Sequence, residues 1–205
     1  MTMKSADAKR VKIIESALRR FSHFGMAKTT MAEIAKDLAF SKALLYYYFP
    51  DKNNLYAAVW NHLLDELLDR GDVIIARGGK VAEVTNLLLE ERMHFLNDYY
   101  NVFADAYSFR FDIPSDLQDL IPKIFEKELQ QFVRLLQIGV ANGEIEMDDV
   151  EDTARIFLVS ILGMRLGLLK DFNAIFTPPT KEEVLQMLNM QKRLAAIFLN
   201  GLKKC

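Results

Sequence analysis

The chain has 205 residues, of which 51% are hydrophobic and 26% are charged, with nine glycines and five prolines. This composition supplies a real core and excludes an intrinsically disordered chain, and the scarcity of helix breakers favours helices. The only cysteine, Cys205, excludes an intramolecular disulfide and a zinc knuckle.

The charge is unevenly distributed, although the formal net charge is only −2. Residues 1–55 hold ten Lys or Arg and five Asp or Glu, whereas residues 56–205 hold 16 basic and 23 acidic residues. A basic N-terminal segment followed by an acidic remainder favours a polyanion-binding module at the N-terminus. Chance variation of the surface charge explains the same numbers equally well, so charge alone does not decide between them.

No membrane span or secretory signal is predicted. The longest apolar stretch, residues 156–164, is interrupted by Ser160 and Gly163 and is far shorter than the roughly 20 residues that a span needs. Residues 1–7 contain no apolar signal core. We therefore expect a cytoplasmic protein without a membrane partner.

The first predicted helix covers about residues 6–24 and ends before Gly25, a natural helix C-cap. Its apolar face recurs at helical spacing and consists of Ile14, Ala17, Leu18 and Phe21. Thr30 then caps a short helix over residues 31–38, in which Glu33 completes a capping box.

A tight turn at residues 39–40 leads to Ser41, which caps the next helix at residues 42–49. Pro50 ends that helix, and Asp51 caps a longer one over residues 52–72. Two short helices across a tight turn, preceded by a supporting helix, indicate a helix-turn-helix.

The remainder predicts long helices at about 80–108, 115–141, 148–171 and 181–203. The breaks fall at Gly71, Gly78-Gly79, Pro114, Asn142-Gly143 and residues 177–179. No alternating run favours a strand, so the predicted fold class is all-α, with an N-terminal three-helix head and a larger helical body.

The helix at 42–49 has the pattern of a DNA recognition helix, because Leu45 and Phe49 form a core face and the other side chains point elsewhere. Lys42 could donate a hydrogen bond to O6 or N7 of guanine, and Ala43 and Leu44 could pack on thymine methyl groups. The candidate DNA-binding residues are Thr30, Ser41, Lys42, Ala43, Leu44, Tyr46, Tyr47, Tyr48 and Lys52.

Each of these residue types has a reason to lie near DNA. Tyrosine hydroxyls reach phosphates or base edges, Thr30 and Ser41 lie at helix N-termini that favour a phosphate, and Lys52 adds charge beside them. The alternative is an aromatic patch at a protein interface. Three consecutive tyrosines point about 100° apart, so they cannot share one buried face.

The segments Ile14–Phe21, Gly25, Thr29–Ala35, Ser41–Lys52 and Leu55 resemble the TetR family of bacterial repressors in order and spacing over about residues 9–60. The resemblance implies a homodimer with DNA-binding domains at residues 1–50 and ligand-binding and dimerisation domains at residues 51–205. It also implies a repressor that a small molecule releases from a pseudo-palindromic operator on double-stranded DNA.

Three residues depart from the family pattern. Ala39 stands where the turn usually carries glycine, which costs about 1 kcal/mol if the residue is left-handed. Leu44 replaces a common threonine and Tyr48 a common histidine. These two changes put the operator sequence in doubt and leave the helix-turn-helix frame intact.

The resemblance implies that the last two long helices, about 148–171 and 181–203, form the dimer. Two apolar stripes are consistent with it, Ile156, Val159, Leu162, Gly163, Leu166 and Gly167 on the first helix and Met190, Leu194 and Phe198 on the second. An ordinary core within one chain fits the same stripes.

The candidate ligand site lies at residues 93–110, where aromatic and polar side chains mix: Met93, His94, Asn97, Tyr100, Phe103 and Tyr107. Plain core packing is the alternative for each of them. The 14 phenylalanines and nine methionines favour a small apolar or aromatic ligand, although they also fill cores.

Two other classes of function compete with the repressor. The first is a helical protein-interaction adaptor that does not bind DNA. The second is a small enzyme, suggested by Glu91-x-x-His94, which has the spacing of half a di-iron site. The sequence contains no second Glu-x-x-His and no glycine-rich phosphate loop. We therefore expect no catalytic residue, no metal and no cofactor.

Overall fold

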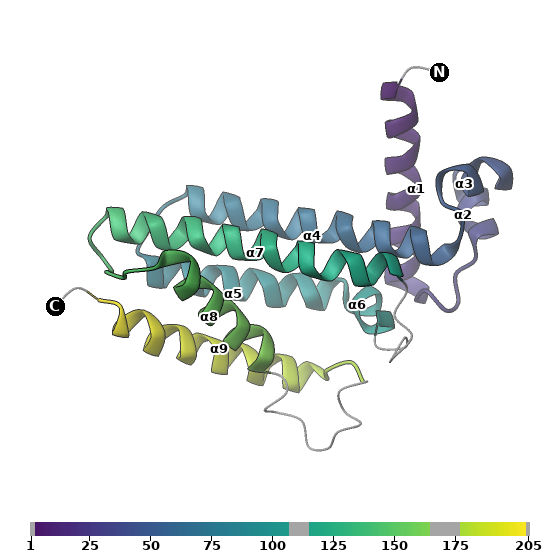
Figure 1. The fold of residues 1–205 in the computed structure, drawn as a ribbon. Helices are drawn as coiled ribbons and strands as arrows, with labels where there is room; N and C mark the ends of the chain where they lie inside the picture. Colours follow the sequence, from purple (N-terminus) through teal and green to yellow (C-terminus); the bar gives the residue numbers. More distant parts are fainter. Residues whose placement is uncertain (1–2, 107–114, 165–176, 204–205) are drawn as a thin grey trace. The chain divides into compact units, whose positions relative to one another are not determined.

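The computed structural model describes residues 3–106, 115–164 and 177–203, and its helices are shown in Figure 1. The helices are α1 Met3–Phe24, α2 Met31–Asp37, α3 Lys42–Tyr48, α4 Lys52–Ala76, α5 Val81–Asp98, α6 Tyr100–Ala106, α7 Ser115–Ala141, α8 Val150–Gly163 and α9 Lys181–Gly201. Within these ranges, extended pairing is limited to an isolated bridge between Ile145 and Lys203. The predicted all-α class is confirmed.

The helix ends near the N-terminus follow the local sequence. Gly25 adopts φ +79° and its N–H donates to the carbonyl of Phe21 at 2.9 Å, which ends α1. Thr30 and Glu33 form the predicted capping box at the start of α2. The hydroxyl of Ser41 accepts from the N–H of Leu44 at 3.1 Å at the start of α3.

The predicted helix at 80–108 is two helices in the described residues, α5 and α6, which are separated at Tyr99. Asn97 and Asp98 at the end of α5 are residue types whose side chains compete for backbone hydrogen bonds, which disfavours continuation of the helix. The side chain of Asn101 then donates to the carbonyl of Ser22 at 2.8 Å, a contact with α1 that periodicity does not reveal.

Gly71 was expected to mark a break, but α4 continues through it to Ala76. A Cβ atom at Gly71 would lie 2.7 Å from Oε1 of Gln131 on α7. The glycine therefore allows the Gln131 side chain to lie close against α4 and does not end the helix.

The chain divides into two compact units. The first comprises Met1–Asp65 and Tyr99–Pro122, and the second comprises Glu66–Asp98 and Lys123–Cys205. The boundary predicted after residue 50 falls within the first unit. The reason is that α4 begins with buried residues of that unit, among them Tyr56, which meets Phe21 edge to face at 5.7 Å.

The aromatic core of the first unit is centred on Trp60, the only tryptophan of the chain. Its ring lies 4.8 Å from that of Phe103 on α6 and 6.3 Å from that of Tyr56. Trp60 is therefore a natural fluorescent reporter of this unit.

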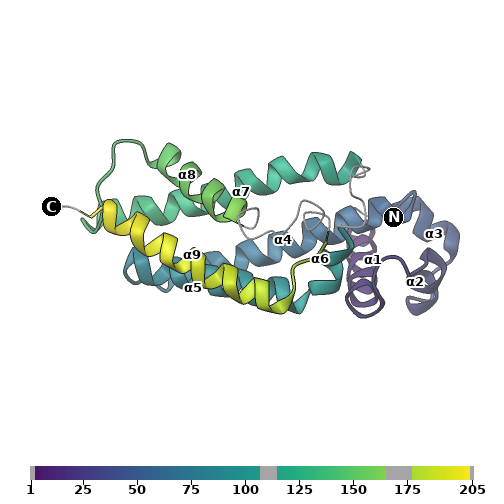
Figure 2. The ribbon, with the colours of Figure 1, turned by 90° about the horizontal axis from the view of Figure 1, so that it is seen from below.

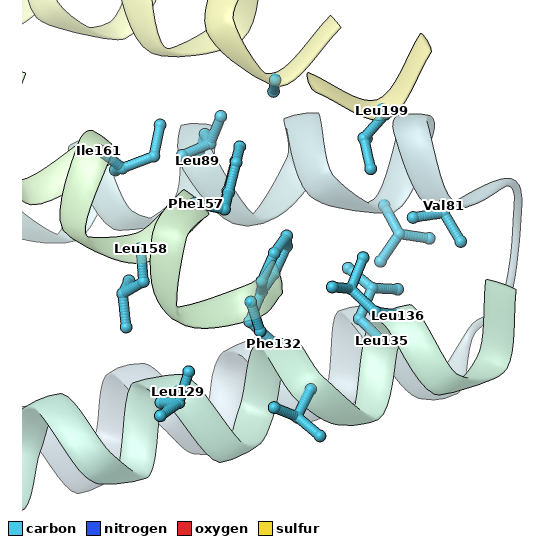
Figure 3. Close-up of a cluster of buried hydrophobic side chains, with 14 of the residues drawn as sticks. Val81, Leu89, Leu129, Phe132, Leu135, Leu136, Phe157, Leu158, Ile161 and Leu199 are labelled. Carbon is cyan, nitrogen blue, oxygen red and sulfur yellow. The ribbon is translucent and has the colours of Figure 1, made fainter. Parts of the chain in front are cut away.

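The second unit has a core drawn from α5, α7, α8 and α9. Figure 3 shows Leu89, Phe132, Phe157, Leu158 and Ile161 gathered from the first three of these helices. The rings of Phe132 and Phe157 stack at 4.5 Å with an interplanar angle of 15°. Helices α5 and α9 lie side by side (Figures 1 and 2), and Ala195 and Leu199 of α9 join the core.

A search of the described helices for a candidate membrane span found none that combines the necessary length with the necessary hydropathy.

Candidate functional site

Helix α3 separates a buried face from an exposed one. Leu45 and Phe49 are buried, as the spacing predicts. Most of the other side chains face solvent: Lys42, Ala43, Tyr46 and Tyr47 are exposed, whereas Leu44 and Tyr48 are half-buried. Tyr47 is 80% exposed, and its ring meets that of Tyr48 edge to face at 5.3 Å. The outward face of α3 therefore offers a cation, small apolar groups and phenol hydroxyls.

The turn between α2 and α3 is held by backbone hydrogen bonds. The N–H of Ala39 donates to Lys36 at 3.1 Å, and the N–H of Phe40 donates to Ala35 at 2.9 Å. Ala39 has φ +52°, so the alanine does occupy a left-handed position. The turn keeps its geometry without glycine at the expected cost in strain.

An ion-pair cluster braces α2 against α1. The guanidinium of Arg20 donates two hydrogen bonds to Asp37, of 2.5 and 2.9 Å, and lies 3.3 Å from a carboxylate oxygen of Glu33. The bond from Arg20 lowers the pKa of Asp37, and the bonds from Thr30 lower the pKa of Glu33. Both carboxylates are therefore charged at neutral pH, and the cluster ties α2 to α1.

Lys52 has a role within the head that spacing did not reveal. Its ammonium group donates to the carbonyls of Met26 at 2.9 Å and of Thr29 at 3.2 Å. It therefore ties the start of α4 to the turn that precedes α2. Thr30, Ser41 and Lys52 lie at the starts of α2, α3 and α4, and Thr30 and Ser41 are exposed.

Helix α6 is attached to the same turn. A carboxylate oxygen of Asp105 accepts from the backbone N–H of Met26 at 2.5 Å, and the hydroxyl of Tyr56 donates to the carbonyl of Val102. Burial raises the pKa of Tyr56, so this hydroxyl keeps its proton. Together with the bond from Asn101 to Ser22, these contacts fasten α6 to the end of α1, to the turn that follows it and to α4.

A cavity of about 80 Å³ lies in the second unit, bordered by α4, α5, α7 and α8. Its apolar walls are Leu67, Leu68, Leu88, Leu89, Phe132, Phe157, Leu158 and Ile161. Five of these residues appear in Figure 3 as part of the core between α5, α7 and α8: Leu89, Phe132, Phe157, Leu158 and Ile161.

Most polar groups of this cavity wall are already paired. Arg92 donates to Glu128 at 2.5 Å. Glu91 accepts from Arg70 at 3.0 Å. The amide nitrogen of Gln131 donates to the carbonyl of Leu68, at 2.8 Å. The exception within the described residues is the hydroxyl of Thr85, which is buried and has no hydrogen-bond partner.

The residues predicted for a ligand do not line this cavity. Met93 and Phe103 are buried, Tyr100 is half-buried, and His94 and Asn97 are exposed. Tyr107 lies outside the described residues. His94 instead borders a second, wider hollow of about 490 Å³, together with Arg70, Arg77 and Leu87. Sequence reasoning missed the first cavity because its residues come from four helices, and no periodic pattern shows which faces meet.

Helices α8 and α9 leave apolar side chains exposed. On α8 these are Ile156, Val159 and Leu162, and on α9 they are Leu185, Met190 and Ile197. Leu194 and Phe198, from the predicted stripe on α9, pack instead against the core of the second unit. Residues 165–171 of the predicted dimer helix lie outside the described residues.

The described residues offer no group of three or more His, Cys, Asp or Glu arranged to hold a metal ion. Glu91 of the Glu-x-x-His motif is paired with Arg70, and His94 is exposed.

Comparison with known proteins places these features in a family. Residues 13–59 match the model of the bacterial regulatory proteins of the tetR family. Over 62 residues the chain is 42% identical to the HTH-type transcriptional regulator RutR of Escherichia coli, a match that covers 30% of this chain and 29% of RutR. These two matches concern the head.

Two further matches extend over nearly the whole chain. The uncharacterised HTH-type transcriptional regulator YfiR of Bacillus subtilis is 24% identical over 189 residues, or 90% of this chain and 88% of YfiR. The crystal structure of a transcriptional regulator from Cytophaga hutchinsonii superposes with a TM-score of 0.80 and 26% identity, covering 94% of this chain and 97% of the other. The exposed face of α3, the braced turn and these matches agree: residues 13–59 carry the DNA-binding domain of the tetR family, and the chain is a DNA-binding transcriptional regulator similar to members of that family.

Proposed function

We propose that this regulator is a homodimeric repressor, released from a pseudo-palindromic operator when a small, mainly apolar molecule binds the cavity of the second unit. The observation that carries the proposal is the division of α3 into a buried face and an outward face of Lys42, Ala43, Tyr46 and Tyr47. The proposal assigns the chain no catalytic step and no cofactor.

The outward face of α3 matches what a major groove requires. Lysine donates to guanine oxygen and nitrogen atoms, alanine packs on thymine methyl groups, and tyrosine hydroxyls reach phosphates or base edges. The exposed Thr30 and Ser41 cap the N-termini of α2 and α3, where backbone N–H groups favour a phosphate.

Fluorescence anisotropy on labelled DNA from upstream of the protein's own gene tests DNA binding, with titrations at several salt concentrations. The proposal expects tight binding that weakens steeply with salt, because cationic side chains displace counterions from phosphates. A scrambled duplex is the control. Absent binding, or equal and salt-insensitive binding of both duplexes, favours the protein-interaction adaptor.

Tyr46→Ala and Lys42→Ala test the placement of the recognition face. Each is expected to lower DNA affinity by about 1–3 kcal/mol per half-site without loss of helicity. Lys80→Ala is the matched control, because Lys80 is also exposed but lies just before α5 in the second unit. Wild-type affinity in the two head variants contradicts the proposal.

The exposed apolar residues of α8 and α9 are the proposed dimer surface. Ile156 is 53% exposed and Ile197 is 70% exposed, which is a costly arrangement for an isolated subunit. A two-fold interface places the same patch of both copies together and suits the reading of two half-sites.

Sedimentation velocity of Ile156→Glu tests that surface. The proposal expects a monomer for this variant, because two carboxylates would be buried at a two-fold interface without partners. Leu87→Glu is the control, since Leu87 is 50% exposed but lies on α5. An Ile156→Glu dimer as tight as the wild type contradicts this surface.

Release of DNA requires the cavity and the head to be coupled, and two segments connect them along the chain. Helix α4 carries Lys52 at its start and Leu67 and Leu68 of the cavity wall further along. Helix α5 carries Leu88 and Leu89 of the wall and leads through Tyr99 into α6, whose Asp105 binds the turn before α2. We propose that a ligand acts on the head through these helices.

A further inference from the structure

Arg10 is a cation beside the recognition helix to which the sequence pattern assigns no role. It lies on α1, and its guanidinium carbon is 5.1 Å from the centre of the ring of Phe49, the residue that follows the end of α3. Phe49 is 3% exposed, whereas Arg10 is exposed. The side chain of Arg10 therefore covers a buried ring at the end of α3 and still reaches solvent.

The charge of Arg10 is not neutralised within the described part of the chain. Its guanidinium forms no ion pair or hydrogen bond with the described residues, whereas Arg20 of the same helix is held by Asp37. Contact with an aromatic ring leaves the N–H donors of an arginine available for an anion.

The surrounding sequence adds positive charge and offers little to neutralise it. Asp7 is the only acidic residue among the first 12, and it stands against four basic residues: Lys4, Lys9, Arg10 and Lys12. Lys12 is also exposed. A polyanion is therefore the partner that this end of α1 favours.

Arg10 lies at the end of α1 that is far from α6. The other end of α1 is fastened to α6 by the bond from Asn101 to the carbonyl of Ser22 (Figure 1). At 1.5 Å per residue, Arg10 and Ser22 are about 18 Å apart along the helix. Among the side chains described for α1, the first buried one is that of Ile13, so Arg10 belongs to a segment that extends beyond the core of the first unit beside α3.

A phosphate is the DNA group that suits a cation in this position. When α3 lies in a major groove, its outward side chains meet base edges, and the phosphates run along both sides of the groove. An arginine from a neighbouring helix then lies beside the phosphates. Its planar guanidinium can donate two parallel bonds to phosphate oxygens, and the ring of Phe49 restrains it before DNA arrives, which reduces the entropy lost on binding.

We infer that Arg10 is a further DNA-binding residue, which contacts a phosphate at the edge of the groove that α3 enters and adds affinity without reading the sequence. This inference rests on the placement of α3 in the proposed function and is independent of any ligand in the second unit.

Fluorescence anisotropy of the full-length protein tests it, on the upstream duplex and on the scrambled duplex at several salt concentrations. Arg10→Met removes the charge and leaves an apolar side chain against Phe49. We expect the slope of log affinity against log salt concentration to become shallower by about 0.9 for each bound head. Affinity for the two duplexes should fall by the same factor, roughly threefold to tenfold for each head.

Two further variants separate a phosphate contact from packing. Arg10→Lys keeps the charge and should keep the wild-type slope, with part of the affinity lost because the planar guanidinium is gone. Arg19→Met is the matched control and should leave the slope unchanged. Arg19 is also exposed on α1, but it lies nine residues further along, which turns it half a revolution away from Arg10. Urea unfolding followed by Trp60 fluorescence verifies that each variant is folded.

A wild-type slope in Arg10→Met overturns the inference, as does an equal change of slope in Arg10→Met and Arg19→Met. An equal loss of slope in Arg10→Met and Arg10→Lys assigns Arg10 to packing on Phe49 and also overturns the phosphate contact.

Lys42→Ala distinguishes failure of this inference from failure of the proposed function. If Lys42→Ala loses affinity and Arg10→Met does not, α3 remains the recognition helix and only the role of Arg10 is overturned. Wild-type affinity in both variants overturns the placement of α3 as well.

Discussion

Ala39 stands at a left-handed position in the turn between α2 and α3, where glycine is preferred. It is exposed and has φ +52°, so the left-handed strain is not offset by packing of its methyl group. Ala39→Gly is expected to raise the free energy of unfolding by about 0.5–1 kcal/mol, since relief of strain exceeds the entropy that glycine adds to the unfolded chain. Urea unfolding followed by Trp60 fluorescence measures it.

Ala27→Gly provides the control for that substitution. Ala27 is also exposed and lies in the turn before α2, but it is not among the residues with positive φ. Glycine there should leave stability unchanged or lower it slightly. Equal effects of the two substitutions would mean that strain at Ala39 is not what limits the stability of the turn.

Lys52 and Lys42 are both lysines of the head, but only Lys52 donates to backbone carbonyls in the structure. Lys52→Ala should therefore lower the stability of the first unit by about 1–3 kcal/mol as well as weaken DNA binding. Lys42→Ala should change stability by less than about 0.5 kcal/mol while weakening DNA binding. Trp60 fluorescence in urea and anisotropy, at one protein concentration, measure the two quantities.

A Lys52→Ala variant as stable as Lys42→Ala would show that the two carbonyl contacts contribute nothing to the head. Loss of DNA affinity in Lys52→Ala would then be assigned to a direct phosphate contact.

At the scale of elements, the sequence predicts best those features that depend on neighbouring residues. The capping box of Thr30 and Glu33, the cap at Ser41 and the burial of Leu45 follow from positions three or four residues apart. The break at Tyr99 was missed because contacts of α6 with α1 fix it. The continuity of α4 through Gly71 was missed because it depends on the distant Gln131.

The cavity was missed for the same reason. Leu67, Leu88, Phe132 and Leu158 are each ordinary core residues in their own helix, and only the packing of four helices brings them around one space. The sequence does not reveal that the Thr85 hydroxyl lacks a partner either, since a threonine on an apolar helix face usually has a hydrogen-bond partner nearby.

Gly139 lies where α7 packs closely against Val81 at the start of α5. A Cβ atom at Gly139 of α7 would lie 2.3 Å from a methyl carbon of Val81 and 2.9 Å from one of Ile145, and both side chains are buried. Gly139→Ala should lower stability by about 1–2 kcal/mol, because overpacking of about 1–3 kcal/mol exceeds the gain of up to about 1 kcal/mol in helix propensity. Thermal unfolding followed by circular dichroism measures it.

Gly201→Ala is the control for overpacking. Gly201 ends α9, and a Cβ atom there would meet nothing within 4 Å. Alanine should leave stability unchanged or raise it slightly. A stabilised Gly139→Ala variant would show that α5 and α7 move apart at little cost.

At the scale of the whole molecule, a two-fold dimer binds two half-sites at a fixed spacing. Insertion of five base pairs between the half-sites turns one of them by about half a helical turn, so that both heads cannot bind together. Wild-type affinity for the altered operator should fall at least tenfold, or about 1.4 kcal/mol. The Ile156→Glu monomer should bind both duplexes with the same, weaker affinity. Anisotropy on the two duplexes measures this difference, and a wild-type protein indifferent to the insertion would mean that each head binds DNA independently of α8 and α9.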